Sequence, residues 1–246
     1  MDVRQYLDST YLKTAEQAGL SSQENQEVVA RFVKEAIDEG FKLIMIRPDM
    51  VKMARQIVDR EQSSLLIGTV IDFPNGNSAL GDKLREAAQA IEDGADELDF
   101  VCNYRAFING DEDTVKREVL EGTRLAIDHL KVAKWIIEVA ALDPAQIARL
   151  SALIKGVVVP NFEGHYNDIF VKSSTGFYQT PNGSPNGATV ESVTIMLENA
   201  APLPVKAAGG VRTLDEAIQM IQLGVKRIGT SSAKAIAGGG ASTSGY

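Results

Sequence analysis

The stretch SSQENQEVVARFVKEAIDEGFKLIMI, residues 21–46, contains the unit from which the rest of the chain is built. Ser21 and Glu24 have the spacing of a capping box, and apolar residues then recur at three- and four-residue intervals up to Gly40. This pattern predicts a helix that begins at Ser21 and ends before Gly40. The short apolar run 41–46 that follows is bounded by Pro48 and is typical of a buried strand.

The same helix-and-strand unit recurs along the chain. Apolar runs typical of strands lie at 6–10, 41–46, 64–71, 97–101, 134–139, 169–173, 204–208 and 226–229. Further helical patterns lie at 79–93, 112–130, 144–154, 189–199 and 213–224. Strands that alternate with helices form a parallel sheet with crossover helices.

The number of units decides between two parallel-sheet folds. An open, doubly wound sheet would carry a G-x-G-x-x-G turn after an early strand, and none is present. Eight units in 246 residues fit a closed barrel better. We therefore predict an α/β protein, a single (β/α)8 TIM-barrel domain over residues 1–246, with a flexible Gly/Ser-rich tail at 238–246.

The composition limits the class of partner. Lys and Arg number 25 against 33 Asp and Glu, and the net charge of −8 disfavours non-specific binding to nucleic acid or to a membrane surface. No apolar run is long enough to span a membrane and residues 1–5 contain no hydrophobic signal region, so we expect a cytoplasmic protein. The single cysteine, Cys102, excludes an intrachain disulfide and a cysteine-cluster metal site.

Four charged residues interrupt the apolar strand runs: Asp8, Asp99, Lys172 and Lys206. Barrel enzymes carry their chemistry at the C-terminal ends of the strands, which makes these residues candidates for a site. A single lysine near a strand end is more often solvent-facing or paired in a structural role. Two lysines that end neighbouring strands, together with an aspartate, favour chemistry instead, because buried charges persist where they are paired or functional.

The paired lysines predict covalent chemistry by an amine. A lysine becomes a nucleophile at neutral pH when a neighbouring cation and a partly dry pocket lower its pKa, and Lys206 is the expected neighbour of Lys172. The amine then forms a Schiff base with a carbonyl substrate, and the iminium accepts the electron pair of a cleaved carbon–carbon bond. This reaction needs no metal and no cofactor, but it needs an acid/base, for which Asp99 is placed.

Glycine-containing loops follow the last three predicted strands: SSTG at 173–176, GGVR at 209–212 and GTSS at 229–232. Backbone N–H groups of such turns bind phosphate, and in barrels the loops after the seventh and eighth strands are the usual place. A phosphate site is therefore expected. Its predicted residues are Gly176, Gly209, Gly210, Val211, Arg212, Gly229, Ser231 and Ser232.

These loops and the lysine segments resemble the motifs of the deoxyribose-phosphate aldolase family. The resemblance also includes LDST at 7–10, DFPNG at 72–76, GADELD at 94–99 and YR at 104–105, and it extends in order from about residue 7 to residue 233. It implies a class I aldolase of deoxyribonucleotide catabolism that cleaves 2-deoxy-D-ribose 5-phosphate reversibly to D-glyceraldehyde 3-phosphate and acetaldehyde. The implied partners are a small phosphorylated sugar and, because barrels of this family are frequently dimers, a second copy of the chain in a homodimer.

The resemblance also implies the roles of individual residues. Lys172 matches the Schiff-base lysine, Lys206 matches the lysine that perturbs it, and Asp99 matches an acid/base that works through a water. Asp8 and the terminal Tyr246 match positions that take part in proton relay at the enamine carbon in some members.

The chain departs from the family pattern in a few places. Met45 stands where cysteine is frequent, and Val139-Ala140 stands where Thr-Gly or Thr-Cys is common. Segments 157–167 and 178–186 look like insertions on either side of the predicted sixth strand. These segments are expected to affect access of substrate or contacts between subunits.

Two other interpretations stay open on the residues alone. A different Schiff-base aldolase would keep the paired lysines and the phosphate loops and act on another substrate. A non-catalytic barrel that senses a sugar phosphate would keep the glycine loops but lose Lys172, Lys206 or Asp99. Because all three are present, the enzyme interpretation is favoured.

Overall fold

The strands of the protein close into a barrel. The computed structural model describes residues 2–240, and within them eight parallel strands pair in chain order, with β1 joined to β8. The strands are β1 (Leu7–Thr10), β2 (Leu43–Ile46), β3 (Leu66–Ile71), β4 (Glu97–Val101), β5 (Val132–Ile136), β6 (Ile169–Lys172), β7 (Val205–Ala208) and β8 (Arg227–Thr230). The predicted (β/α)8 barrel is confirmed.

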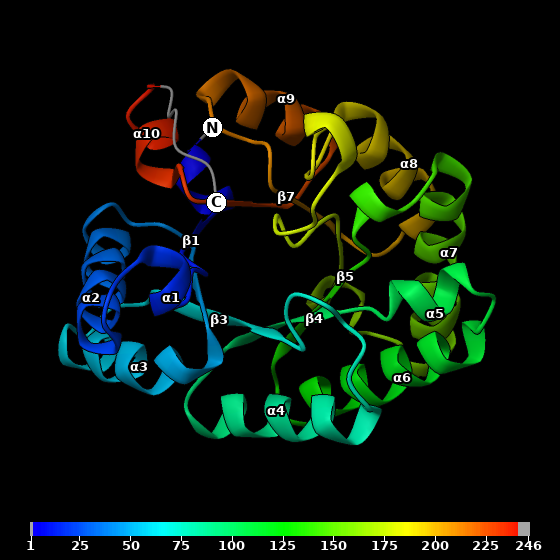
Figure 1. Ribbon diagram of the computed structural model, residues 1–246, viewed down its shortest axis with the longest axis horizontal. Coiled ribbons are helices and arrows are strands. Elements are labelled where there is room, and N and C mark those ends of the chain that lie inside the picture. The colour runs from blue at the N-terminus through cyan, green and yellow to red at the C-terminus, as the bar shows by residue number, and fades with distance from the viewer. Residues whose placement is uncertain (1, 241–246) are drawn as a thin grey trace.

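Helices surround the barrel (Figure 1). Over the described part of the chain they are α1 (Ala15–Ala18), α2 (Ser22–Asp38), α3 (Val51–Arg60), α4 (Leu80–Glu92), α5 (Tyr104–Ile108), α6 (Glu112–Asp128), α7 (Pro144–Asn161), α8 (Val190–Ala200), α9 (Leu214–Leu223) and α10 (Ala233–Ala237). The predicted capping box of α2 forms: the Glu24 N–H donates to Ser21 Oγ over 3.2 Å, and the Ser21 N–H donates to the Glu24 carboxylate over 2.8 Å. No helix within residues 2–240 has the length and apolar character to cross a membrane.

Two predicted elements end three residues or more from the expected position. Strand β5 stops at Ile136 rather than at residue 139, because Glu138 has a left-handed backbone, with φ 58°, and a 3₁₀ helix follows at Val139–Ala141. Helix α7 continues beyond residue 154 to Asn161 because Val157 and Val158 are buried. The segment 157–167, expected as an insertion, therefore contains the last turns of α7.

The two faces of the sheet differ in character. Most side chains that face the helices are apolar, and among them Phe100 stacks on Trp135 with ring centroids 4.8 Å apart. The Trp135 Nε1–H donates to Thr123 Oγ1 of α6 over 3.0 Å, which satisfies the polar atom of this buried ring. The face toward the barrel axis instead holds buried charged side chains: Asp8, Glu97, Asp99, Lys134, Lys172, Lys206 and Arg227.

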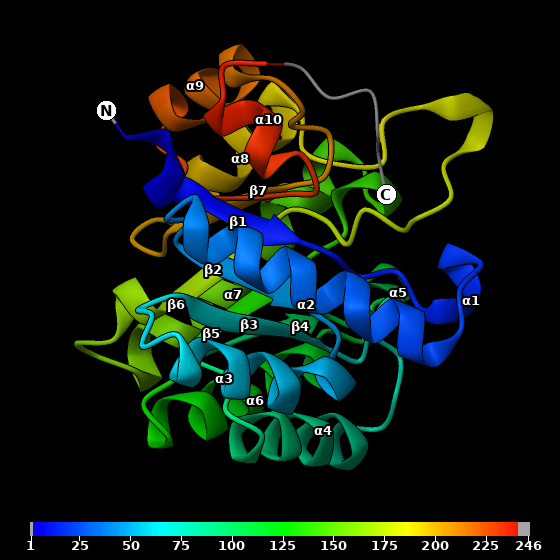
Figure 2. The same cartoon turned by 90° about the vertical axis from the view of Figure 1, so that its left-hand side faces the viewer.

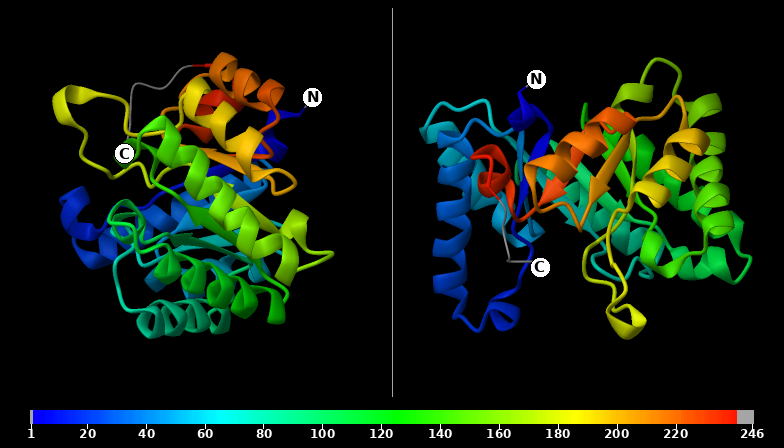
Figure 3. Two further views of the ribbon diagram at one scale, coloured as in Figure 1. Left: turned by 90° about the vertical axis from the view of Figure 1, so that its right-hand side faces the viewer. Right: turned by 90° about the horizontal axis from the view of Figure 1, so that it is seen from above.

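The loop between β6 and α8 leaves the barrel at the C-terminal ends of the strands. It is yellow in Figures 2 and 3 and projects to the same side as α1, which follows β1. The loop then returns: the Ala188 N–H donates to the carbonyl groups of Ala208 and Gly209, each over 3.1 Å. Gly187 packs so closely on Gly209 that a Cβ would lie 2.4 Å from the Gly209 carbonyl carbon. Segment 178–186 therefore belongs to the end of the barrel at which sites form.

The chain end follows α10. The N–H groups of Gly238, Gly239 and Gly240 donate to carbonyl groups of α10 over 2.8–3.1 Å. The rest of the predicted flexible tail, including Tyr246, lies outside the described residues.

Candidate active site

Asp99 lies at the centre of the charges inside the barrel. Its Oδ2 accepts hydrogen bonds from Lys172 Nζ over 2.8 Å and from Lys206 Nζ over 2.9 Å, while its Oδ1 accepts one from Lys134 Nζ over 2.7 Å. Lys172 and Lys206 are register partners on the neighbouring strands β6 and β7, so both side chains face the barrel axis. The structure thus brings three predicted site residues together and adds Lys134, which the sequence analysis missed.

A second carboxylate, Asp8 of β1, contacts Lys206 from another side, with Oδ2 2.6 Å from Nζ. Arg227 of β8 donates from Nε to Asp8 Oδ1 over 2.8 Å and from Nη1 to Glu97 Oε1 over 3.0 Å. Lys134 Nζ lies 2.5 Å from Glu97 Oε2, which closes the network. Asp8, predicted as a site candidate because its charge interrupts a strand run, therefore belongs to the same set of ion pairs as the two lysines.

The charges of this network do not balance when every group is ionised. Three carboxylates face four basic groups in the buried interior of the barrel, which leaves one net positive charge, and unbalanced buried charge is unfavourable. Lys134, Lys206 and Arg227 each pair with two carboxylates. Among the residues that the structure describes, Lys172 pairs with Asp99 alone. Lys172 is therefore the base that gives up its proton most readily.

The pKa shifts follow the same order. Burial lowers the pKa of Lys172 to about 8; Asp99 opposes this change, and Lys206 adds to it. Burial acts on Lys206 in the same sense, but Asp8 and Asp99 together raise its pKa. Burial also opposes ionisation of Asp99, yet the three surrounding lysines hold its pKa well below its usual range. The largest cause of the Lys172 shift is thus burial rather than the neighbouring cation named first from the sequence.

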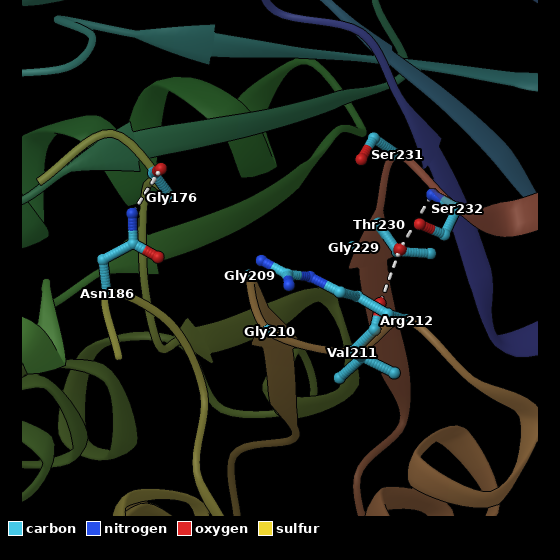
Figure 4. A pocket seen from close by; sticks show the side chains of 10 residues that line it. All are labelled: Gly176, Asn186, Gly209, Gly210, Val211, Arg212, Gly229, Thr230, Ser231 and Ser232. Carbon is cyan, nitrogen blue, oxygen red and sulfur yellow. Dashed lines mark hydrogen bonds between the residues drawn. The ribbon is translucent and has the colours of Figure 1, made fainter. Parts of the chain in front are cut away.

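All eight residues predicted to bind phosphate line a single pocket of about 70 Å³ at the ends of β6, β7 and β8 (Figure 4). Gly176, Gly209 and Gly210 have φ values of 80°, 72° and 84°, in the left-handed region that glycine tolerates. Ser232 Oγ is buried and has no hydrogen-bond partner within the described chain. A pocket with glycine loops and a free buried hydroxyl suits an anion with several acceptor oxygens.

The pocket has two further lining residues, Asn186 and Thr230. Asn186 Nδ2 donates to the Gly176 carbonyl over 3.0 Å, so the loop after β6 folds back onto itself at the pocket wall (Figure 4). Thr230 Oγ1 donates to the Val211 carbonyl over 2.8 Å and accepts the Ser232 N–H over 3.0 Å, which ties the two last loops together. The sequence analysis did not predict Asn186. Its position between Pro185 and Gly187, in the loop after the predicted nucleophile, is a local signal that could have identified it.

A closed barrel with a buried lysine of lowered pKa and a glycine-lined pocket at the C-terminal ends of its last strands has the features of a barrel aldolase. Residues 12–237 match the model of the DeoC/LacD family aldolases. The chain belongs to this family, which confirms the resemblance found in the sequence.

Known proteins are similar over nearly the whole chain. The chain is 36% identical over 233 residues to the deoxyribose-phosphate aldolase of Thermococcus gammatolerans, covering 94% of this chain and 93% of that protein. It is 34% identical to the deoxyribose-phosphate aldolase of Thermococcus kodakarensis, with 94% and 93% covered.

Solved structures agree with this assignment. The aldolase QR15 superposes with a TM-score of 0.81 at 33% identity, covering 97% of this chain and 95% of that one. The tetrameric deoxyribose phosphate aldolase from Aeropyrum pernix superposes with a TM-score of 0.77 at 28% identity, covering 96% and 89%.

Proposed function

We propose that the protein is a class I aldolase of deoxyribonucleotide catabolism that cleaves 2-deoxy-D-ribose 5-phosphate reversibly into D-glyceraldehyde 3-phosphate and acetaldehyde. The observation that carries the proposal is the presence, at one end of the barrel, of both Lys172 with its pKa lowered to about 8 and a pocket with the features of a phosphate site. The substrate itself is inferred from the relatives, which are named deoxyribose-phosphate aldolases.

In this mechanism the neutral amine of Lys172 attacks C1 of the open-chain sugar and water leaves, which gives a protonated Schiff base. A base takes the proton of the C3 hydroxyl, the C2–C3 bond breaks, and its electron pair moves to the iminium to form an enamine. Glyceraldehyde 3-phosphate departs with the new carbonyl at the former C3. Protonation of C2 and hydrolysis then release acetaldehyde and the free Lys172 amine.

The other proposed site residues either move protons or keep the Lys172 amine neutral. Asp99, assisted by a water, is the acid/base for the C3 hydroxyl. Lys206 helps to keep Lys172 unprotonated, and Asp8, which pairs with Lys206, belongs to the relay at the enamine carbon. Tyr246, outside the described residues, is assigned to the same relay by its match to the family. No step as written uses a metal or a cofactor.

The phosphate of the substrate is assigned to the loops after β6, β7 and β8. Backbone N–H groups and hydroxyls in the pocket are the proposed donors, and Arg212 adds a positive charge. The proposed partners are therefore this small phosphorylated sugar and other copies of the chain in a homo-oligomer. A homodimer is the assembly expected from the family, and a tetramer is known for the Aeropyrum pernix protein. The proposed pathway places the protein in the cytoplasm.

The test is an assay of glyceraldehyde 3-phosphate release from 2-deoxy-D-ribose 5-phosphate, coupled to the oxidation of this aldehyde by NAD⁺ and phosphate with an added dehydrogenase. We expect activity without added metal that survives a chelator, and loss of activity in the chelator would contradict the mechanism. Borohydride added with substrate should reduce the Schiff base and fix the adduct on Lys172, located by peptide mass mapping. An adduct on Lys206 instead would refute the assignment of the nucleophile.

A further inference from the structure

Glu138 is a buried carboxyl outside the network of the barrel axis. Its side chain lies just past the end of β5 and the residue is 1% exposed. Every other carboxylate buried within residues 2–240 lies 3.1 Å or less from a cationic side chain. These carboxylates are Asp8, Glu97, Asp99 and Glu118. Glu138 makes no ion pair within residues 2–240, and the positive charge of Lys172 only lowers its pKa from a distance, so its hydrogen bonds need another explanation.

All hydrogen bonds found for the Glu138 carboxylate go to one residue, Thr175. The Thr175 N–H donates to Oε2 over 3.3 Å, and the Thr175 hydroxyl donates to the same oxygen. Thr175 Oγ1 in turn accepts the N–H of Phe177 over 3.0 Å. The carboxylate therefore holds the loop after β6 at a single point.

This contact continues the pairing of β5 with β6 beyond the ends of both strands. The Ile137 N–H donates to the Lys172 carbonyl over 3.0 Å, and the Val139 N–H donates to the Ser173 carbonyl over 2.9 Å. Between these two backbone bonds the chain turns at Glu138 into the left-handed region, with φ 58°. A residue other than glycine keeps this conformation where its surroundings fix it, and such residues cluster at functional sites.

The loop that Glu138 holds separates two pockets. Gly176 lines the phosphate pocket. Phe177, the next residue, lines a second pocket of about 320 Å³, to which Glu138 also belongs. Lys172, the proposed nucleophile, lies three residues before Thr175. The position of Thr175 therefore sets how far the Gly176 wall lies from the Lys172 amine.

We infer that Glu138 is a positioning residue that fixes the loop 173–177 through Thr175 and so sets the spacing between the Lys172 amine and the phosphate pocket. This inference rests on the proposed function, because it assigns phosphate to the Gly176 pocket. Fixing a reactive group relative to a remote binding group raises the rate for the substrate that uses both. Burial raises the pKa of Glu138 to about 7, and the hydrogen bonds from Thr175 oppose this rise.

The experiment compares Glu138→Gln, Thr175→Val and Thr175→Ser with the wild type. Calorimetry with inorganic phosphate measures the affinity of the pocket for phosphate. The ratio of cleavage of deoxyribose 5-phosphate to cleavage of free deoxyribose measures whether the pocket and the Lys172 amine keep their spacing. We expect Glu138→Gln and Thr175→Val to weaken phosphate binding about tenfold, the size of one lost charge-assisted hydrogen bond, and Thr175→Ser to stay close to wild type. The preference for the phosphorylated sugar should fall by a similar factor, while kcat for free deoxyribose changes little.

A matched control is Glu163→Gln, the same substitution at an exposed residue, which should alter none of these values. Equal losses on both sugars with unchanged phosphate affinity would overturn the inference, because they would place Glu138 in the chemistry or in folding alone. A wild type that binds no inorganic phosphate would overturn it as well. Failure of the proposed function looks different: the wild type would bind phosphate, the variants would bind it less, and deoxyribose 5-phosphate would stay intact. Thr175→Val leaves Glu138 in the sequence, so this variant still tests the inference if Glu138→Gln does not fold.

Discussion

Lys172 and Lys206 donate to the same oxygen of Asp99, over 2.8 and 2.9 Å. Two ammonium groups this close repel each other, so the arrangement favours a state in which one amine is neutral. Within residues 2–240, Lys206 has a second carboxylate partner, Asp8, and Lys172 has none. The difference in partners, together with burial, therefore lowers the pKa of Lys172 and not that of Lys206, which supports Lys172 as the proposed nucleophile.

Replacing Lys172 by Met should abolish cleavage and raise stability at neutral pH. Burial lowers the pKa of Lys172 from 10.5 to about 8, so between these values the folded state binds fewer protons than the unfolded state. The resulting cost to folding is fully present below pH 8 and disappears as the pH rises above 10.5. Methionine has similar length and no charge, and its gain at pH 7 should be about 1–3 kcal/mol.

Urea unfolding of Lys172→Met and wild type at pH 7 and pH 10 measures this gain. The difference in the free energy of unfolding should shrink at pH 10, where wild-type Lys172 is neutral in the folded protein. A variant that is less stable than wild type at pH 7 would contradict the argument.

Replacing Lys206 by Leu should move the pH dependence of kcat/KM toward higher pH. Lys206 contributes to the lowered pKa of Lys172, but burial contributes more, so the shift should be smaller than the whole displacement of the Lys172 pKa. Stability should fall by about 3 kcal/mol or more, because Asp8 and Asp99 each lose a buried cation. Lys206→Leu activity that stays equally low at every pH would instead assign Lys206 to substrate positioning or proton transfer.

The sequence predicted the fold well because its signals are local. Apolar runs, capping boxes such as Ser21–Glu24 and the terminal glycines mark most strands and helices without knowledge of tertiary contacts. The errors fall at element ends that tertiary contacts determine. Burial of Val157 and Val158 extends α7, and the left-handed turn at Glu138 ends β5.

The site was predicted in part for the same reason. Lys172, Lys206 and Asp99 were found as charges within apolar runs, and the structure places them together. Lys134 was missed because the strand was placed too late in the sequence, which made Lys134 its first residue rather than a central one. Arg227 was missed because its partners, Asp8 and Glu97, lie 219 and 130 residues away in the chain, and no local pattern reports such a pairing.

Replacing Lys134 by Met should make Asp99 easier to protonate. Lys134 is the first of the cations that hold the pKa of Asp99 below its usual value, and its loss leaves Glu97 paired with Arg227 alone. Because the folded pKa of Asp99 is depressed, its contribution to stability is present above about pH 4 and is lost as the pH falls through the folded value. Acid unfolding of Lys134→Met should therefore begin at a higher pH than in wild type. Arg85→Met, at an exposed residue, is the control that should leave the acid transition in place.

The last prediction concerns the phosphate pocket. Ser232 is 4% exposed, and its hydroxyl lines the pocket with no partner among the described residues. Ser232→Asp puts a carboxylate where the phosphate of the substrate is proposed to bind, and like charges at that distance repel strongly in a partly buried site. KM for deoxyribose 5-phosphate should rise tenfold or more, which corresponds to about 1.4 kcal/mol of binding, while kcat/KM for free deoxyribose should change by less than about threefold. Ser232→Asn introduces a side chain of the same size as aspartate but without its charge, so it distinguishes charge repulsion from steric crowding. It should cause a much smaller rise in KM than Ser232→Asp. Equal rises for Asp and Asn would mean that the side chain only fills space, and equal losses on both sugars would place the phosphate elsewhere.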